Sequence, residues 1–294
     1  MDISRKRFGS IIPFVYLLPS LAIITFIYLN SLVKVIFYSL VEWDGFTPTS
    51  KFNNFEKFKV VLSNPDFFTC FKNSITILVT VIPALIILGI VATQFMYMGI
   101  KGAKFFRFLF FIPEILPVVV VGILFSFFLQ KIGPLNQLLR LVHLDALAVD
   151  WFANSRYSLW GLIIVIVWKD IGFPIVLFLS RLSHTSPSLY ESARIDGAGE
   201  FRLLLNITIP ELKDVIVLYS VLACIGNLTN LFPYIFVTTN GGPGYSSTVM
   251  EYFIYLHTFR YFYVGQGTAV AVLLFGITLV LSLFYFKLYD REIS

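Results

Sequence analysis

Three ionisable side chains that could do chemistry lie inside strongly apolar stretches of this sequence. Glu114 stands in "FIPEILP", and Lys169 and Asp170 are adjacent in "VWKDIGFP". Charged groups are costly inside a membrane, and where they occur they often relay protons or line an ion path. Glu114 can instead reach the membrane interface, and Lys169 and Asp170 can pair with each other or with neighbouring helices. The sequence holds no chain of buried carboxylates, which argues against a carrier driven by protons or sodium.

The residue patterns that support catalysis are missing from the sequence. There is no G-x-x-x-x-G-K-[ST] loop to cradle phosphates, and His143, His184 and His257 are too scattered for a metal site. The glycines of "GNLTNLF" and "GGPGYSS" lack dinucleotide spacing, and no set of Ser, His and Asp can be assembled. We therefore expect no catalytic residue, no metal site and no cofactor. Energy for uphill transport would come from an ion gradient or from another subunit.

The apolar composition predicts an integral membrane protein. Hydrophobic residues make up 57% of the 294 residues and charged residues 13%, and the mean hydropathy is +0.83. A soluble domain has about 25% charged residues. The formal net charge is +5, but no basic stripe with interleaved aromatic residues points to nucleic acid. The lipid bilayer is therefore the expected surrounding, and nucleic acid is not an expected partner.

The elements that must position these residues are six apolar segments, because a membrane helix needs roughly 20 mostly apolar residues. We expect an all-α membrane protein with a single transmembrane domain over residues 1–294. Its predicted spans are about 12–33, 73–98, 106–129, 157–180, 215–238 and 264–288. Several spans contain proline, which in a membrane helix produces either an ordinary kink or a broken helix that lines a path. These prolines are Pro83, Pro113, Pro117, Pro174 and Pro233.

Positive residues indicate how the chain crosses the membrane. The short loop "GIKGAKFFRF" carries Lys101, Lys104 and Arg107 and no acidic residue. Short loops rich in lysine and arginine stay on the cytoplasmic side. We therefore expect a multi-pass protein of the cell (inner, cytoplasmic) membrane with both termini in the cytoplasm. The loop 181–214 is then the longest cytoplasmic loop.

This long loop begins with a helix signal. Ser186 can cap a helix whose first turn accepts Pro187, and Ser188 and Glu191 have the spacing of a capping box. The pattern predicts a short helix here, lying either as an amphipathic linker at the interface or as a surface for another protein.

The second half of the loop is rich in small residues. Ala193 and Gly197 are four residues apart and share a helix face that is nearly bare of side chains, so another surface can approach the backbone closely. Gly197 and Gly199 would each cost a helix about 1 kcal/mol, which favours a turn. We expect a second short helix over "EFRLLLNITI", ended by Pro210.

The loop resembles the coupling-loop signature of ABC importer permeases, E-A-A-x-x-D-G-A followed by I-x-L-P. The matching residues are Glu191, Ala193, Asp196, Gly197, Ala198, Ile207 and Pro210. Ser192 replaces the first alanine, Leu204 stands where an aromatic residue is common, and Asp214 where proline is common. The stretches "LLPSLAIITFIYL", "FKNSITILV", "GPLNQLL", "TIPEL" and "TTNGGPGYSSTVM" follow in the order seen in maltose/glycerol-phosphate-like sugar permeases. The element around Thr239 and Pro243 is characteristic of that subgroup.

The resemblance implies a type I ABC importer permease fold with six spans and a cytoplasmic coupling helix. It implies that ATP and Mg are bound by two ATP-binding cassette subunits rather than by this chain. Further implied partners are a second homologous permease and an extracytoplasmic solute-binding protein that delivers a sugar or oligosaccharide. By this resemblance Glu191 is a polar anchor, Asp196 and Gly197 shape the turn, and Ala193 and Ala198 permit close packing against the ATPase.

Recognition of a sugar would fall to mid-membrane aromatic and polar groups, because rings stack on sugar faces and amides bond hydroxyls. Two stretches offer such groups, "WKDIGF" and "GNLTNLFPY", and the resemblance favours the second. The candidates are Trp168, Phe173, Asn227, Thr229, Asn230, Phe232 and Tyr234. Asn227 and Asn230 share a helix face and could equally join helices to one another.

Two alternative functions remain open from the sequence. One is an ABC permease for another solute, such as a phosphate ester. The other is a secondary transporter or channel that acts alone and would transport without ATPase partners.

Overall fold

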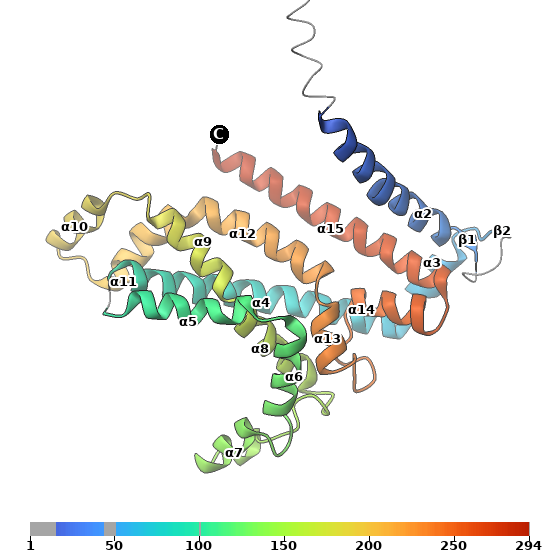
Figure 1. The fold of residues 1–294 in the computed structure, drawn as a ribbon, viewed down its shortest axis with the longest axis horizontal. Coiled ribbons are helices and arrows are strands. Elements are labelled where there is room, and N and C mark those ends of the chain that lie inside the picture. The colour runs from blue at the N-terminus through green and yellow to red at the C-terminus, as the bar shows by residue number, and fades with distance from the viewer. Residues whose placement is uncertain (1–15, 44–50, 100, 294) are drawn as a thin grey trace, which may run out of the picture. The chain divides into compact units, whose positions relative to one another are not determined.

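The computed structural model describes residues 16–43, 51–99 and 101–293 of the chain. Its packing divides into two compact units, Met1–Ser63 with Ile254–Leu273, and Asn64–Phe253 with Leu274–Ser294. Helices dominate both units (Figure 1). A helix satisfies its backbone hydrogen bonds within one segment, which is what an apolar membrane interior demands.

The first unit joins a helical N-terminal segment, Tyr16–Ser39, to a small two-stranded sheet. In chain order its elements are η1 (Thr25–Leu29), α2 (Asn30–Ser39), β1 (Val41–Glu42), β2 (Lys51–Phe52), α3 (Glu56–Leu62), η4 (Leu256–Arg260) and the start of α15 (Val264–Ile293). The strands pair antiparallel, with Val41 opposite Phe52. This short hairpin therefore follows directly on the first apolar helix.

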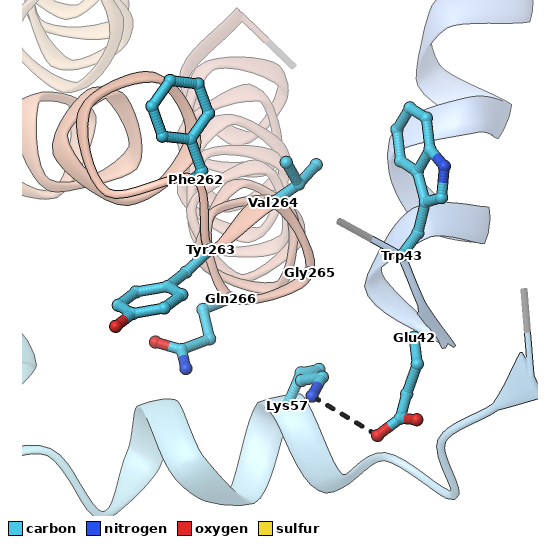
Figure 2. A pocket seen from close by; sticks show the side chains of 8 residues that line it. All are labelled: Glu42, Trp43, Lys57, Phe262, Tyr263, Val264, Gly265 and Gln266. Carbon is cyan, nitrogen blue, oxygen red and sulfur yellow. Dashed lines mark ion pairs between the residues drawn. The ribbon is translucent and has the colours of Figure 1, made fainter. Parts of the chain in front are cut away.

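A pocket of about 340 Å³ lies in the first unit, where the start of α15 meets α3 and β1 (Figure 2). Lys57 of α3 and Glu42 of β1 form an ion pair across it at 3.7 Å. A Cβ on Gly265 would lie 3.3 Å from the Cγ of Lys57, so glycine allows this close approach. The Glu42 side chain is 56% exposed, and exposed pairs are worth only about 0–1 kcal/mol. The ion pair itself therefore adds little to the stability of this contact.

The second unit contains the main helical bundle. Its elements in chain order are α4 (Pro65–Tyr97), α5 (Ala103–Ile115), α6 (Val118–Phe128), α7 (Pro134–Leu141), η2 (Asp145–Leu147), α8 (Ser158–Asp170), α9 (Gly172–Leu182), α10 (Pro187–Ile195), α11 (Glu200–Leu203), η3 (Leu204–Thr208), α12 (Ile209–Thr229), α13 (Phe232–Thr238) and the part of α14 (Met250–Tyr255) up to Phe253. The unit also includes the later part of α15.

The long helix α4 forms the centre of this bundle. It begins where Asn64 accepts a hydrogen bond from the Asp66 amide and Pro65 occupies the first helical position, a normal helix start. Its buried side chains include Ile77, Val81 and Leu85. Together with α9 and α12 it makes a three-helix contact (Figure 1), which forms the core of the unit.

Two of the predicted spans are broken. The span predicted at 106–129 consists of α5 and α6, which meet at an angle of 100°. Leu116 between them is extended, because Pro117 disfavours the helical conformation in the residue before it. The span predicted at 215–238 likewise divides into α12 and α13, with the break at Asn230 and Leu231.

Four other spans are close to their predicted positions, whereas the helix Glu200–Thr229 begins and ends well before the predicted 215–238. The helices long and apolar enough to cross a membrane are Tyr16–Ser39, Pro65–Tyr97, Ser158–Leu182, Glu200–Thr229 and Val264–Tyr285. With α5 and α6 taken as one span, the described residues contain six candidates, as the sequence predicts. Residues 12–15 of the first predicted span lie outside the described residues.

The expected end of the second loop helix at Pro210 is wrong. The helical segment continues from Glu200 to Thr229, and Pro210 lies in the first turn of α12 directly after the π-helical turn η3. Proline lacks an amide and clashes with the preceding turn of a regular helix. The wider π-helical turn accommodates it without ending the helix.

The Gly89→Val variant tests the contact between α4 and α9. A Cβ at Gly89 would lie 3.1 Å from Cε2 of Phe178 and 3.2 Å from Cβ of Pro174, and overpacking of this kind costs about 1–3 kcal/mol. We expect a lower melting temperature for the detergent-purified transporter.

Gly276→Val in α15 is the matched control for Gly89→Val. In the described part of the chain, a Cβ on Gly276 would meet no atom beyond its own helix within 4 Å, so this variant should melt like the wild type. Equal melting of the two variants would contradict the close α4–α9 packing.

Candidate functional site

A cavity of about 410 Å³ lies among the broken helices of the second unit. It is bounded by residues of α4, α5, α6, α8, α9, α12 and α13 and by the break after α12. Its polar lining residues are Glu114, Lys169, Asp170, Tyr219, Asn227, Asn230 and Tyr234. Phe173, Leu85 and Leu222 add apolar surface. A cavity with aromatic walls and a few polar groups is the usual form of a small-molecule site.

The break between α12 and α13 is held by a carboxylate from α14. The amides of Leu231 and Phe232 both donate to Oε2 of Glu251, at 2.7 and 2.9 Å. The first amides of a helix have no partner within the helix, so Glu251 serves as the cap of α13. Burial raises the pKa of Glu251, and the two amide hydrogen bonds oppose this by lowering it. The carboxylate thereby fixes the positions of Asn230 and Tyr234 beside the cavity.

Lys169 and Asp170 each find a partner on another helix. Lys169 is 5% exposed as a residue, and its ammonium donates to the carbonyl oxygen of Glu114 at 3.0 Å. This carbonyl belongs to the last turn of α5, where the broken helix leaves carbonyls free. Asp170 accepts a hydrogen bond from the Tyr234 hydroxyl at 2.7 Å. The adjacent pair therefore connects α8 to both broken spans.

Two acceptors on residues that line the cavity have no hydrogen-bond partner among the described residues. They are Oε2 of Glu114 and Oδ1 of Asn227, both buried. The Asn227 amide nitrogen donates to the carbonyl of Ala223 at 2.8 Å, so its oxygen is left for another group. Buried acceptors are costly unless a donor reaches them. The cavity therefore suits a ligand rich in hydroxyl groups.

The structure brings only part of the predicted substrate set to this cavity. Phe173, Asn227, Asn230 and Tyr234 line it. The other candidates point elsewhere: Trp168 packs on Phe125 at 5.1 Å, Phe232 stacks on Phe236 at 5.4 Å, and the Thr229 hydroxyl bonds the carbonyl of Ile225. Glu114 and Tyr219 were not among the predicted substrate residues. For Glu114 the available signal was an ionisable group inside a span.

The predicted loop helix is α10, but its capping is different from the expected pattern. Ser186 occupies the N-cap position and Pro187 the first turn. The Ser186 hydroxyl pairs with that of Ser188 at 2.8 Å, and it makes no hydrogen bond to a backbone amide of α10. The capping box of Ser188 and Glu191 is wrong, because the helix starts one residue before Ser188.

The end of α10 depends on Gly197. This residue has φ of +80°, a left-handed conformation that costs other residues about 1–2 kcal/mol. The Gly197 amide donates to Arg194 and the Ala198 amide to Ala193, at 3.0 and 2.9 Å. These two bonds form a Schellman motif. The predicted glycine turn is therefore present, with Gly199 beginning α11.

The outer surface of α10 is open within this chain. Glu191, Asp196 and Gly197 are exposed, Ala193 and Ala198 are half-buried, and Ile195 is 86% exposed. A Cβ on Gly197 or Gly199 would meet no described atom within 4 Å. In Figure 1, α10 lies at one end of the helices of its unit. The surface therefore has room for another protein.

Comparison with known proteins identifies the class of this chain. Residues 85–293 match the family described as "Binding-protein-dependent transport system inner membrane component". The chain belongs to this family and is therefore an inner-membrane permease subunit of an ABC transporter.

The relatives include permeases of known or assigned transport systems. The chain is 30% identical to the probable ABC transporter permease protein YurN of Bacillus subtilis, covering 96% of this chain and 97% of that protein. It is 29% identical to the diacetylchitobiose uptake system permease protein NgcF of Streptomyces coelicolor, covering 90% and 78%.

A solved structure has the same fold. It is the bacterial alginate ABC transporter in complex with an alginate pentasaccharide-bound periplasmic protein, in which one chain matches with a TM-score of 0.80 and 21% identity. The match covers 99% of this chain and 96% of that chain.

Substitutions at Glu251 test the cap of α13. Glu251→Leu removes the acceptor for two amides, and each unmatched buried group costs about 1–3 kcal/mol. We expect a lower melting temperature of the purified transporter. Glu251→Gln keeps a side-chain oxygen that can accept from both amides and should therefore melt closer to the wild type. A Leu variant as stable as the wild type would contradict the capping role.

Proposed function

We propose that this chain is the permease subunit of an ATP-driven importer for a sugar or oligosaccharide delivered by an extracytoplasmic solute-binding protein. The cavity carries this proposal. Its unmatched acceptors on Glu114 and Asn227 suit sugar hydroxyls, and the rings of Phe173 and Tyr219 suit the apolar faces of a sugar. The diacetylchitobiose permease among the relatives and the oligosaccharide-bound binding protein in the solved neighbour support it.

The exposed surface of α10 is the proposed contact with an ATPase subunit. Glu191 would be its polar anchor, Ala193 and Ala198 would allow close approach, and the turn of Asp196 and Gly197 would set its shape. The sequence has no phosphate-binding loop of its own, so ATP and Mg would be bound by two partner ATPase subunits. A second permease would complete the membrane part. This assignment requires α10 on the cytoplasmic side, with both termini there.

Transport would couple these two places. Closure of the ATPase dimer on ATP would draw the α10 surfaces of both permeases together and tilt the spans, so that the cavity opens alternately inward and outward. In such a mechanism the helices rock around a binding site that stays fixed at the broken helices, so access changes from one side of the membrane to the other while the site keeps its structure.

The Gly197→Val variant tests the proposed ATPase contact. A β-branched residue is strained at φ of +80°, by about 1–2 kcal/mol, so the Schellman turn should distort. We expect fewer ATPase subunits to copurify with the permease and sugar uptake to fall.

Gly199→Val is the matched control in the same loop. Gly199 has φ of −75° and equally open surroundings, so valine there should leave copurification and uptake unchanged. Full copurification and uptake with Gly197→Val would contradict the proposed contact.

Alanine substitutions at Asn227 and Asn230 test the cavity. Each removes a polar group beside the proposed sugar, and one lost hydrogen bond of about 1 kcal/mol corresponds to about fivefold weaker use of the substrate. We expect the KM for uptake of binding-protein-loaded sugar to rise while complex assembly stays normal. Thr229→Val, at the neighbouring position but outside the cavity lining, should take up sugar like the wild type. Normal uptake by both alanine variants would contradict the assignment.

A further inference from the structure

Apart from its backbone connections, α10 meets its unit mainly through one side chain. Tyr190 is the buried residue of this helix, whereas Glu191, Arg194 and Ile195 are exposed. The Tyr190 ring packs against Tyr97 at the end of α4, with ring centroids 5.1 Å apart. The surroundings of Tyr190 therefore decide how α10 is held.

A chain of hydrogen bonds leads from Tyr190 into the bundle. The Tyr190 hydroxyl lies 3.0 Å from Oγ1 of Thr208, and the Thr208 hydroxyl donates to Oε1 of Gln94 on α4. A threonine hydroxyl has one proton to donate, so Tyr190 is the donor to Thr208. Burial raises the pKa of the Tyr190 phenol, which keeps that proton in place. All three residues are buried, and the chain connects α10 to η3 and α4.

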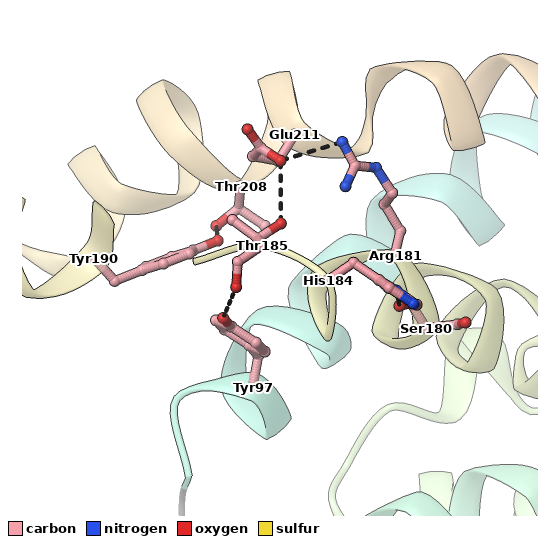
Figure 3. A network of polar contacts seen from close by, with 8 residues as sticks. All are labelled: Tyr97, Ser180, Arg181, His184, Thr185, Tyr190, Thr208 and Glu211. Atoms are coloured by element: carbon pink, nitrogen blue, oxygen red, sulfur yellow. Dashed lines mark hydrogen bonds and ion pairs between the residues drawn. The ribbon is translucent and has the colours of Figure 1, made fainter. Parts of the chain in front are cut away.

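A second branch fixes the segment that leads into α10 (Figure 3). Oε2 of Glu211 accepts from Oγ1 of Thr185 at 3.0 Å and from Nη2 of Arg181 at 3.2 Å. Arg181 lies in the last turn of α9, where the helix dipole favours a positive charge, and Glu211 lies near the start of α12, within the continuous helical segment Glu200–Thr229. The hydroxyl of Tyr97 completes the group with a long bond of 3.5 Å to the Thr185 carbonyl.

These contacts have a mechanical consequence. Apolar packing is not directional, so a helix held by it alone can slide over its neighbours. Hydrogen bonds require defined distances and angles, and breaking them inside a protein leaves unmatched polar groups. Displacement of α10 must therefore carry α4 and α12 with it or break buried hydrogen bonds.

We propose that Tyr190, Thr208, Gln94 and Glu211 form a rigid polar link that transmits the displacement of α10 to the spans α4, α9 and α12. They are positioning residues, and the proposal rests on the proposed function of α10 as the ATPase contact. Thr208 and Glu211 belong to the "TIPEL" stretch, which the sequence singles out but which neither the cavity nor the α10 surface uses.

The test uses the complete transporter, with its ATPase subunits and loaded binding protein, reconstituted in liposomes. Tyr190→Phe removes one hydroxyl and keeps the ring against Tyr97, and Thr208→Val replaces a hydroxyl by a methyl group. We expect both variants to assemble and hydrolyse ATP. The sugar imported per ATP hydrolysed should fall about fivefold, the factor that one buried hydrogen bond supplies.

Two further variants separate this role from a general loss of packing. Thr208→Ser keeps the hydroxyl and should restore the wild-type ratio of sugar to ATP. Thr76→Val, at a threonine of α4 whose hydroxyl bonds the Lys72 carbonyl of its own helix, should not change the ratio. If Thr208→Val fails to assemble, Tyr190→Phe alone decides the outcome.

A wild-type ratio in Tyr190→Phe and Thr208→Val would overturn the link, and so would a Thr208→Ser variant as uncoupled as Thr208→Val. The proposed ATPase contact fails separately, when the ATPase subunits stay bound and uptake stays normal in Gly197→Val. Normal coupling in Tyr190→Phe together with loss of the ATPase in Gly197→Val would reject the link and leave the contact standing.

Discussion

A helix that breaks inside a membrane frees backbone groups that lipid cannot satisfy, and the cavity of this permease depends on how two breaks are satisfied. At the end of α5, the ammonium of Lys169 donates to the free carbonyl of Glu114. At the start of α13, the carboxylate of Glu251 accepts from the amides of Leu231 and Phe232. A cation thus serves the end of one helix and an anion the start of another, the arrangement that the helix dipole favours.

The same constraint explains two of the three ionisable residues within the spans. Lys169 and Asp170 are neighbours in the sequence, yet one holds α5 and the other holds α13 through Tyr234. Both broken spans are therefore tied to α8. These two charges stabilise the helices around the cavity, and what remains for a ligand is apolar surface and two acceptors that are unmatched among the described residues, the Asn227 oxygen and one Glu114 carboxyl oxygen.

The sequence predicts the features of this chain that depend on local composition. Spans follow from runs of apolar residues, and the turn at Gly197 follows from the cost of glycine in a helix. Contacts between segments that are distant in the sequence could not be predicted from the sequence. Nothing near Trp168 indicates that its ring packs on Phe125, and nothing near Leu231 indicates that Glu251 will cap the next helix. The helix end predicted at Pro210 is wrong because the sequence does not reveal the π-helical turn before it, and such a turn can accept a proline that would end an ordinary helix.

The π-helical turn η3 has a consequence for how this region can vary. Each residue of an α-helix advances the direction of its side chain by about 100°, and the π-helical turn at Leu204–Thr208 alters that angular count before α12 begins. The number of residues between Gly199 and Glu211 therefore determines which way the side chains of α12 point around the helix axis. A deletion of one residue would barely shorten the segment, yet it would rotate Thr208 and Glu211 away from Tyr190 and Arg181. Substitutions in this segment keep the contacts between α12 and the preceding loop in register. Insertions and deletions would turn the side chains of α12 away from that loop.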